Sequence, residues 1–312
     1  MKLIRTLADL PSELRRGAVA VGNFDGVHRG HADIVERLCA AARRIGGGAV
    51  VFTFDPHPAR LLRPDLAPPP LTWAERKAEL LAERGADAVI AYPTDAALLA
   101  LTPAEFFTGI IRERLDARAL VEGQNFYFGQ DRAGNVQVLR QLCLQHGIEL
   151  EVVAPRVING SPISSSRIRL ALQRGDVEQA GLMLGRPYRL RGLVARGAGR
   201  GRALGFPTAN LESIDTLVPG PGVYAGRART AGPSWAAAIH IGPNPTFGEE
   251  SLKLEVHLIG FAGSLYGQTL EVDFQARLRD IQAFGSAEEL RDQLQRDIAR
   301  AGNEDGTGPV RE

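Results

Sequence analysis

The chain has 312 residues, which is enough for two cores of ordinary size, so we expect two domains. Its 37 Lys and Arg residues nearly balance its 36 Asp and Glu residues, and a net charge of +1 gives no overall field for nucleic acid or a membrane surface. The two cysteines exclude a disulfide framework, and we find no signal-like N-terminus and no run of about 18 apolar residues. We therefore expect a cytoplasmic protein with neither a nucleic-acid nor a membrane partner.

Five short apolar runs alternate with helical patterns in the first 185 residues. These predicted strands are residues 18–21, 49–54, 88–92, 119–122 and 149–153. Such alternation predicts a doubly wound parallel sheet with helices on both faces, in which ligands bind beyond the carboxyl ends of the strands. Capping boxes that begin at Thr72 and Thr102, the second with Pro103 at the first helical position, predict two of the helix starts.

A glycine-rich loop joins the first predicted strand to a helical pattern. Unpaired N–H groups and the positive end of the dipole attract phosphate at a helix start, and two histidines three residues apart add donors on the same side. The residues that we assign to ATP or phosphate binding there are Gly22, Phe24, Asp25, Gly26, His28 and His31. The alternatives are a plain turn and a zinc site, for which Asp25 is the only nearby third ligand.

Two more unusual loops follow predicted strands of the same sheet. Asp55 and His57 come directly after the second strand, and Asn125 comes after the fourth. Because the carboxyl ends of parallel strands meet at one edge, we expect the three loops to lie together and to form a site.

A second anion site is predicted at the start of a helix near residue 165. Ser164 and Ser165 offer hydroxyl groups there, the backbone offers N–H groups, and Arg167 adds a guanidinium group. The alternative is a helix cap beside a solvated helix face.

The pattern changes after Gly185 to short strands with Gly and Pro turns. The predicted strands are residues 188–195, 223–228, 236–241, 252–259 and 270–274, and they predict a small antiparallel barrel. No helix is expected until a capping box at Ser286, which begins a closing helix that runs to about Ala301. We therefore predict domains at residues 1–185 and 186–302, followed by a disordered tail at 303–312.

The predicted barrel begins with a segment that is rich in glycine and arginine. Flexible N–H groups and guanidinium groups suit phosphate, and the oxygens of Thr208 and Asn210 suit a hard cation such as Mg²⁺. The residues that we assign to ATP or phosphate binding are Gly197, Gly199, Arg202, Gly205, Pro207, Thr208 and Asn210. The alternative is a basic hairpin with an Asn turn.

One predicted strand of the barrel carries three polar residues at alternate positions. Lys253, Glu255 and His257 therefore share one face. Glu255 is a candidate general base, and the alternative is a surface carboxylate paired with Lys253.

Taken together, these segments resemble the bacterial bifunctional riboflavin kinase/FAD synthetase family from about residue 15 to 300. The first domain is similar to a nucleotidyltransferase of the HxGH class, whose motif stands here at His28–His31, with the ISSxxIR-type motif at Ile163–Arg169. The second is similar to the riboflavin kinase barrel, with its GFPTAN motif at Gly205–Asn210 and its strand glutamate at Glu255.

The resemblance implies two reactions, riboflavin plus ATP to FMN and then FMN plus a second ATP to FAD and pyrophosphate. In the first, it implies that Glu255 is the base and that Thr208 and Asn210 hold Mg²⁺. In the second, it implies alignment and charge stabilisation by His28, His31, Ser165 and Arg167. It also implies flavin contacts, from Asn125, Asp55 and His57 in the first domain and from Glu255 and Arg279 in the second.

Some residues depart from the family pattern. Asn125 stands where aspartate is frequent, and four residues of the predicted kinase flap replace charged ones, namely Gly260, Ser264, Ile281 and Ala283. Two other functions stay open, a monofunctional FMN adenylyltransferase with a flavin-binding barrel and a non-catalytic flavin sensor. Glu255 counts against the first of these and His28 against the second. The partners expected are small-molecule substrates, and a monomer and a transient homo-oligomer are both compatible with the sequence.

Overall fold

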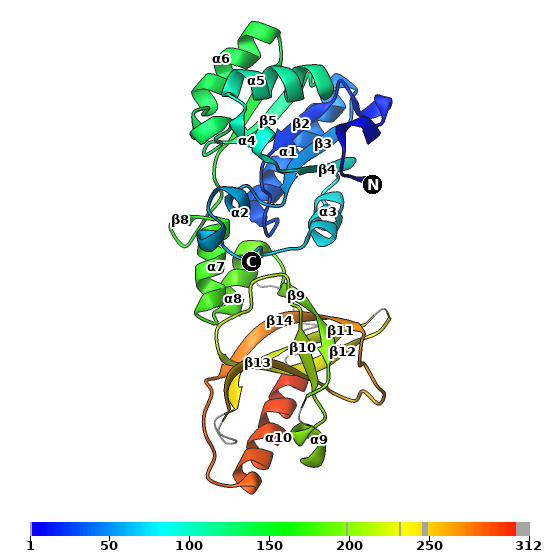
Figure 1. The fold of residues 1–312 in the computed structure, drawn as a ribbon, viewed down its shortest axis with the longest axis vertical. Coiled ribbons are helices and arrows are strands. Elements are labelled where there is room, and N and C mark those ends of the chain that lie inside the picture. The colour runs from blue at the N-terminus through cyan, green and yellow to red at the C-terminus, as the bar shows by residue number, and fades with distance from the viewer. Residues whose placement is uncertain (1, 198, 231, 245–248, 304–312) are drawn as a thin grey trace. The chain divides into compact units, whose positions relative to one another are not determined.

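The computed structural model describes residues 2–197, 199–230, 232–244 and 249–303 (Figure 1). The chain divides by its internal contacts into two compact units. The first comprises Met1–Pro68 and Thr72–Ser164, and the second comprises Pro69–Leu71 and Ser165–Glu312. Each unit has its own sheet and its own candidate site.

The first unit contains a six-stranded sheet in the order β1-β4-β3-β2-β5-β6, and every neighbouring pair is parallel. Its strands are β1 Lys2–Ile4, β2 Ala18–Val21, β3 Ala49–Asp55, β4 Ala88–Pro93, β5 Ala119–Gly123 and β6 Glu149–Val153. The five predicted strands are confirmed within two residues. The edge strand β1 was missed, because three residues are too few to show a period.

Helices cover both faces of this sheet, as predicted. On one face, α1 (Arg29–Ile45) and α3 (Ala74–Ala82) enclose a core that includes Ala18 and Ala20 of β2. On the other, Val19 and Val21 of β2 pack into a second core. The elements on that second face are α4 Ala96–Ala100, α5 Pro103–Phe106, a π-helix Phe107–Arg114 and α6 Val136–His146. Alternate residues of a strand thus enter opposite cores.

One of the two capping boxes of this unit is confirmed and the other is wrong. At α5, the Thr102 hydroxyl accepts a hydrogen bond from Glu105 N, and the Glu105 carboxylate accepts one from Thr102 N at 2.8 Å. At α3, however, Trp73 precedes the first helical residue and no side chain caps the helix. The Thr72 backbone N–H and hydroxyl instead bond to the buried carboxylate of Asp25, a tertiary partner that local sequence does not reveal.

Short elements complete the first unit and do not interrupt the sheet. The helix α2 (Ala59–Leu62) follows β3, and a small hairpin of β7 (Val157–Ile158) and β8 (Ser161–Pro162) follows β6. Single-turn 3-10 helices lie at Leu7–Asp9, Ser12–Leu14, Pro64–Leu66 and Gln130–Arg132.

The second unit contains a closed antiparallel barrel of six strands in the order β10-β13-β12-β11-β14-β9, which confirms the predicted architecture. Its strands are β9 Tyr188–Ala195, β10 Ala209–Glu212, β11 Gly222–Arg229, β12 Ser234–Asn244, β13 Glu249–Leu258 and β14 Thr269–Arg279. The predicted closing helix is α10 (Ala287–Asn303), whose Ala301 packs against Val223 and Leu278 of the barrel.

Two short elements of the barrel were not predicted. The helix α9 (Arg200–Ala203) contradicts the expectation of no helix before Ser286, and β10 lies inside the segment that was interpreted only as a binding motif. Each has four residues, which is too short for a periodic signal.

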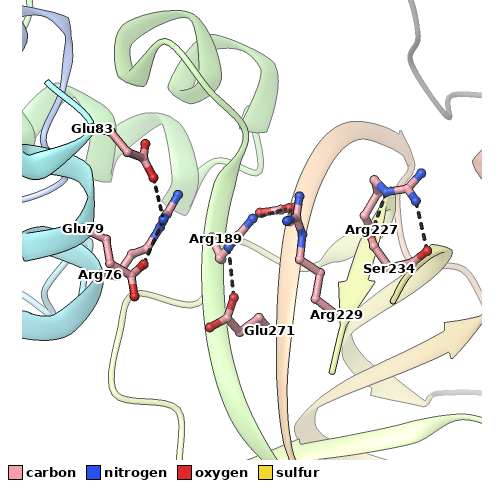
Figure 2. Close-up of polar contacts among 9 residues, drawn as sticks. Arg76, Glu79, Glu83, Arg189, Arg227, Arg229, Ser234 and Glu271 are labelled. Carbon is pink, nitrogen blue, oxygen red and sulfur yellow. Dashed lines mark hydrogen bonds and ion pairs between the residues drawn. The ribbon is translucent and has the colours of Figure 1, made fainter. Parts of the chain in front are cut away.

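Ionic contacts join neighbouring strands of the barrel. The Arg189 guanidinium group of β9 bonds to Asp273 at 2.6 Å and to Glu271 at 3.0 Å, both on β14. Asp273 also pairs with Arg229 of β11 at 3.3 Å. Figure 2 shows the Arg189–Glu271 contact and also the hydrogen bond from Arg227 of β11 to Ser234 of β12.

The helices α7 (Ser165–Gln173) and α8 (Val177–Leu184) belong to the second unit. Gly220 N donates to the Leu172 carbonyl at 2.8 Å, and Arg277 N donates to the Glu178 carboxylate at 2.9 Å. The division by contacts therefore falls at Ser164, about twenty residues before the expected boundary at 185. The boundaries that we expect for independent domains stay predictions. In the expected tail, Asn303 ends α10 and residues 304–312 lie outside the described residues.

Candidate active sites

The loop between β2 and α1 places two imidazole rings at the start of a helix. His28 precedes the first residue of α1, and its Nδ1 accepts a hydrogen bond from His31 N at 3.2 Å. The two rings are stacked, with centroids 3.6 Å apart and planes 12° apart. Because Nδ1 of His28 accepts, Nε2 is the donor of the neutral ring. The helix start that the sequence predicted therefore carries both histidines side by side.

The same loop contains three residues in the left-handed region of backbone space. Phe24 has φ 44°, Gly26 has φ 80° and Val27 has φ 40°. Such a conformation costs about 1–3 kcal/mol for a residue other than glycine. The side chains of Phe24 and Val27 are buried in the core between α1 and the sheet, and their burial offsets that cost.

Asp25 holds the loop from the inside. Its carboxylate is buried and accepts hydrogen bonds from Thr72, while Gly26 N donates to the Thr72 hydroxyl at 3.3 Å. These contacts are structural, and a phosphate contact of Asp25 or of Gly26 stays a prediction.

Lys77 of α3 lies behind the loop. Its ammonium group donates to the carbonyl of Asn23 at 2.8 Å and to the hydroxyl of Thr53 at 3.3 Å. Burial lowers the pKa of Lys77, while the carboxylates of Asp25 and Asp55 act in the opposite direction. The lysine thus brings a hydrogen-bond donor to the backbone of the loop between β2 and α1. Sequence reasoning missed it, because a single lysine in an amphipathic helix forms no motif.

A cavity of about 220 Å³ lies at the carboxyl edge of the sheet, where β2 and β5 are neighbours. Residues on its wall that the sequence singled out are Gly22, Phe24, His28, His31 and Asn125. Asp55 and His57 are not among its lining residues, and Asp55 pairs instead with Arg5 at 3.0 Å. Two of the three predicted loops therefore converge on this cavity, and a flavin contact of Asp55 or His57 stays a prediction.

The wall of this cavity includes polar residues that the sequence did not single out. The side-chain oxygen of Asn23 is buried and has no hydrogen-bond partner among the described residues. Arg156 also lines the cavity and pairs with Asp33 at 3.0 Å. Glu122 of β5 is 2% exposed and accepts a hydrogen bond from Val21 N at 2.7 Å. Burial raises the pKa of Glu122 well above its usual range.

The predicted serine and arginine motif lies at the start of α7. Ser164 is the last residue of the first unit, and Ser165 begins α7 in the second, which confirms the helix start. Roles for Ser164, Ser165 and Arg167 in phosphate binding stay predictions.

The barrel has a cavity of about 200 Å³ that contains nearly all of the predicted kinase residues. Those on its wall are Gly197, Gly199, Arg202, Pro207, Thr208, Asn210, Glu255 and Arg279, whereas Gly205 is not on it. Lys253 and His257 line the cavity with Glu255, so the three alternate residues of β13 share its inner side as predicted. Ile281, one of the departures from the family pattern, contributes an apolar side chain to the same wall.

The glycine-rich segment lies directly against the motif that contains Thr208 and Asn210. A Cβ atom at Gly197 would come within 2.2 Å of the Asn210 side chain, and one at Gly201 would come within 2.5 Å of the Phe206 carbonyl. A side chain at Gly201 would displace the backbone at Phe206, and one at Gly197 would displace the Asn210 side chain, so both positions favour glycine.

Glu255 has a polar neighbour on each adjacent strand. It is directly opposite Asn210 of β10 and directly opposite His240 of β12. His240 Nε2 lies 3.3 Å from the Pro243 carbonyl and donates to it. Burial lowers the pKa of His240, while the charge of Glu255 acts in the opposite direction.

Arg279 is held at the cavity wall by the closing helix. Its Nε and Nη2 donate to the buried carboxylate of Asp297 in α10 at 3.0 and 2.8 Å. Gln293 donates to the other oxygen of Asp297 at 2.8 Å. The helix therefore fixes the direction of the Arg279 side chain as well as covering the barrel.

Among the described residues, no group of three or more His, Cys, Asp or Glu side chains is arranged to hold a metal ion. None of the helices in the described ranges is both long enough and apolar enough to cross a membrane.

Comparisons with known proteins assign a family to each part of the chain. The FAD synthetase family matches residues 10–167, and the riboflavin kinase family matches residues 184–304. A crystal structure from Streptococcus pneumoniae, described as a macrolide-efflux protein, is 31% identical and superposes with a TM-score of 0.85 over 97% of this chain and 98% of that one.

Three curated relatives that match nearly the full length of the chain carry one name. Proteins named bifunctional riboflavin kinase/FMN adenylyltransferase are 37% identical in Pseudomonas fluorescens, over 96% of this chain and 97% of the relative, and 34% identical in Escherichia coli K12, over 95% and 96%. The one in Bacillus subtilis is 33% identical over 94% and 93%. With two cavities lined by the two sets of motif residues, and with relatives that match from end to end, the chain belongs to the family of bifunctional riboflavin kinase/FMN adenylyltransferases.

Proposed function

We propose that this chain converts riboflavin to FMN in the barrel and FMN to FAD at the edge of the parallel sheet, with one ATP consumed in each reaction. The observation that carries the proposal is that each unit has its own cavity, and that several of the motif residues of one reaction line each cavity. The full-length match to relatives named for both activities supports the same assignment.

In the kinase reaction, Glu255 is the general base. A hydroxyl group is a poor nucleophile until its proton leaves, so the 5′-hydroxyl of riboflavin must give its proton to a positioned acceptor as it attacks the γ-phosphate. The Glu255 carboxylate lies on the cavity wall between Asn210 and His240. Arg279, fixed by Asp297, supplies a directed donor to the flavin from the same wall.

The residues of the barrel site fit Mg²⁺, the cation expected with ATP. The hydroxyl of Thr208 and the side-chain oxygen of Asn210 are hard donors of the kind that Mg²⁺ prefers, and both residues lie on the cavity wall beside the glycine-rich segment. When bound there, Mg²⁺ would neutralise charge on the phosphates of ATP. Gly197, Gly199 and Arg202 of the glycine-rich segment would hold those phosphates.

In the adenylyl transfer, no base is needed, because the FMN phosphate is already an anion at neutral pH. The reaction requires alignment of that phosphate with the α-phosphate of ATP and stabilisation of the developing charge. His28 and His31 supply imidazole donors from the start of α1, and Asn125 supplies an amide from the loop after β5. Ser165 and Arg167 would add donors from α7.

We also infer that small molecules are the only partners of the enzyme and that it works in the cytoplasm, as a monomer or a transient homo-oligomer. The balanced charge offers no broad surface for nucleic acid, and both cysteines are buried and unbridged.

One assay tests the proposed function against both alternatives. The purified chain is supplied with riboflavin and Mg-ATP, and FMN and FAD are resolved by chromatography. The proposal expects FMN to appear first and FAD to follow. FAD from supplied FMN without any phosphorylation of riboflavin would indicate a monofunctional adenylyltransferase, and flavin binding without either product would indicate a sensor.

A further inference from the structure

Glu122 is a buried carboxyl group in the wall of the FMN adenylyltransferase cavity, and no motif accounts for it. It is the fourth residue of β5 and shares a face of the strand with Leu120, which packs in the same core as Leu139 of α6. It is 2% exposed. A carboxylate in such surroundings is expensive unless a cation pairs with it.

No such cation is present among the described residues, where Glu122 forms no ion pair. Its one hydrogen bond there is the 2.7 Å contact from Val21 N to Oε1. The ionisable groups of the neighbouring helices are the thiol of Cys143 in α6 and the imidazoles of His28 and His31 at the start of α1. Burial raises the pKa of Cys143 to about 12. The thiol supplies no positive charge, because it stays protonated, and neither imidazole forms an ion pair with Glu122 among the described residues.

The position of Glu122 in the sheet explains the contact with Val21. The parallel pairing of β2 with β5 is registered at Ala18 and Val19 only, whereas β5 stays paired with β6 as far as Gly123. The two strands thus part before their carboxyl ends, and the Glu122 side chain crosses the gap to Val21 N. One oxygen of the carboxyl group is fixed by this contact, and the group as a whole lines the cavity with His28 and Asn125.

A neutral carboxyl group in this place has a proton to donate. Its Oε1 already accepts from Val21, so the O–H group is directed elsewhere, and a buried donor without an acceptor is costly. The cavity is the one that would receive the reacting phosphates, whose oxygens are strong acceptors. An ionised carboxylate would repel the same oxygens, so a bound phosphate and the neutral form of Glu122 favour each other.

We propose that Glu122 is a further substrate-binding residue of the adenylyltransferase site, and that its neutral carboxyl group donates a hydrogen bond to an anionic oxygen of the reacting phosphates. The proposal rests on the proposed adenylyl transfer at this cavity. It assigns to Glu122 a role that Gln can partly fill, since an amide also accepts from Val21 N and donates to a phosphate, and that Met cannot.

The test measures FAD formation from supplied FMN and ATP between pH 6 and 10 for the unchanged chain, Glu122→Gln and Glu122→Met. We expect the KM for FMN or for ATP of the unchanged chain to rise about tenfold per pH unit once Glu122 ionises. We expect this rise of KM at alkaline pH to disappear in Glu122→Gln. At pH 7, kcat/KM should fall by about three- to tenfold in Glu122→Gln and by about 10- to 100-fold in Glu122→Met.

Glu151→Gln on β6 is the matched control, because it removes a carboxylate from the same sheet at a half-exposed position where it pairs with Arg37. It should leave both the rate and the pH profile unchanged. Riboflavin phosphorylation by each variant reports whether the chain is intact.

The outcomes separate the possibilities. If the rise of KM at alkaline pH persists in Glu122→Gln, the contact of Glu122 with Val21 is purely structural. If kcat/KM of that variant falls by 100-fold or more, the ionised form of Glu122 is needed. Either result overturns the proposal. If Glu122→Gln does not fold, the pH profile of FAD formation by the unchanged chain decides, because KM values for FMN and for ATP that both stay constant up to pH 10 contradict the proposal. An unchanged chain that makes FMN but no FAD would overturn the adenylyltransferase function itself, and the role of Glu122 with it.

Discussion

His240 and Glu255 are direct cross-strand partners on β12 and β13, and both side chains line the cavity of the barrel. The histidine is neutral in the folded chain over a wider range than a free histidine, because burial lowers its pKa from the ordinary value of 6.5. A half-buried titratable group therefore lies beside the residue that we assign as the base of the kinase reaction.

The lowered pKa of His240 predicts a loss of stability on the acid side. Because the folded-state pKa of His240 is below 6.5, the unfolded chain binds the proton more readily. The penalty is absent above the unfolded value, grows as the pH falls below 6.5, and is complete below the folded-state pKa. Thermal unfolding of the barrel at pH 5 and pH 8 should show a smaller acid loss of Tm in His240→Gln than in the unchanged chain. Equal losses in the two would show that His240 does not contribute.

Glu255→Gln should separate the two activities in one direction. The amide keeps the shape of the side chain but cannot take the proton of the riboflavin hydroxyl, so FMN formation should fall by about 100-fold or more. FAD formation from supplied FMN should stay near that of the unchanged chain. A surface glutamate paired with Lys253 would instead contribute about 0–1 kcal/mol, and the kinase rate would then hardly change. Both rates are measured on the same preparation.

His28→Ala and His31→Ala should separate the activities in the other direction. Each removes an imidazole donor at the start of α1, and the loss of a preorganised donor to transition-state charge costs about 100-fold or more. FAD formation from supplied FMN should fall by that factor in each variant, while FMN formation from riboflavin should persist. Unimpaired FAD formation in both would show that the transfer takes place elsewhere.

Lys77→Met should weaken the adenylyl transfer without changing the kinase reaction. The ammonium group holds the carbonyl of Asn23, and a hydrogen bond to a charged group contributes about 1.5–3 kcal/mol. We expect a loss of about 10- to 100-fold in kcat/KM for FAD formation. Arg76→Met is the control, because Arg76 on the same helix bonds to Glu79 and Glu83 rather than to the loop. Similar losses in the two variants would attribute the effect to the helix as a whole.

Fragments of the chain test where the barrel becomes autonomous. The change of pattern near Gly185 predicts that residues 186–312 are soluble and phosphorylate riboflavin. The contacts of α7 and α8, such as that of Leu172 with Gly220, predict that a fragment from Ser165 is more stable. Thermal unfolding and kinase assays of the two fragments compare these boundaries, and an inert product in both cases would indicate that the barrel needs the first unit.

The sequence predicted the strands whose apolar residues form a distinct run. The strands from Ala18 and Ala49 and the barrel strand from Tyr188 were found because their apolar runs are flanked by turns. The strand β10 escaped because it has only four residues inside a binding motif. Thr72 was misread as a helix cap because its partner, Asp25, is distant in the sequence.

The candidate sites were predictable where a motif was continuous in the sequence. His28 and His31 occur within one turn of each other, and Thr208 and Asn210 lie together before Glu255. Glu122 had no such signal, because a glutamate at the end of an apolar strand is ordinary in sequence and becomes unusual only when the fold buries it. A sequence pattern does not reveal a residue that acts through a single tertiary contact.

The left-handed backbone of Phe24 and Val27 has a consequence for how variants of this protein are interpreted. The loop keeps its shape because two apolar side chains are anchored in the core beside α1, so the volume of that core helps to determine the shape of the proposed phosphate site. Natural or engineered changes of size at Val35 or Leu38, which are fully buried in that core, would then alter the affinity for nucleotide as well as the stability of the chain. Substitutions in this core therefore change the shape of the loop that forms the proposed site.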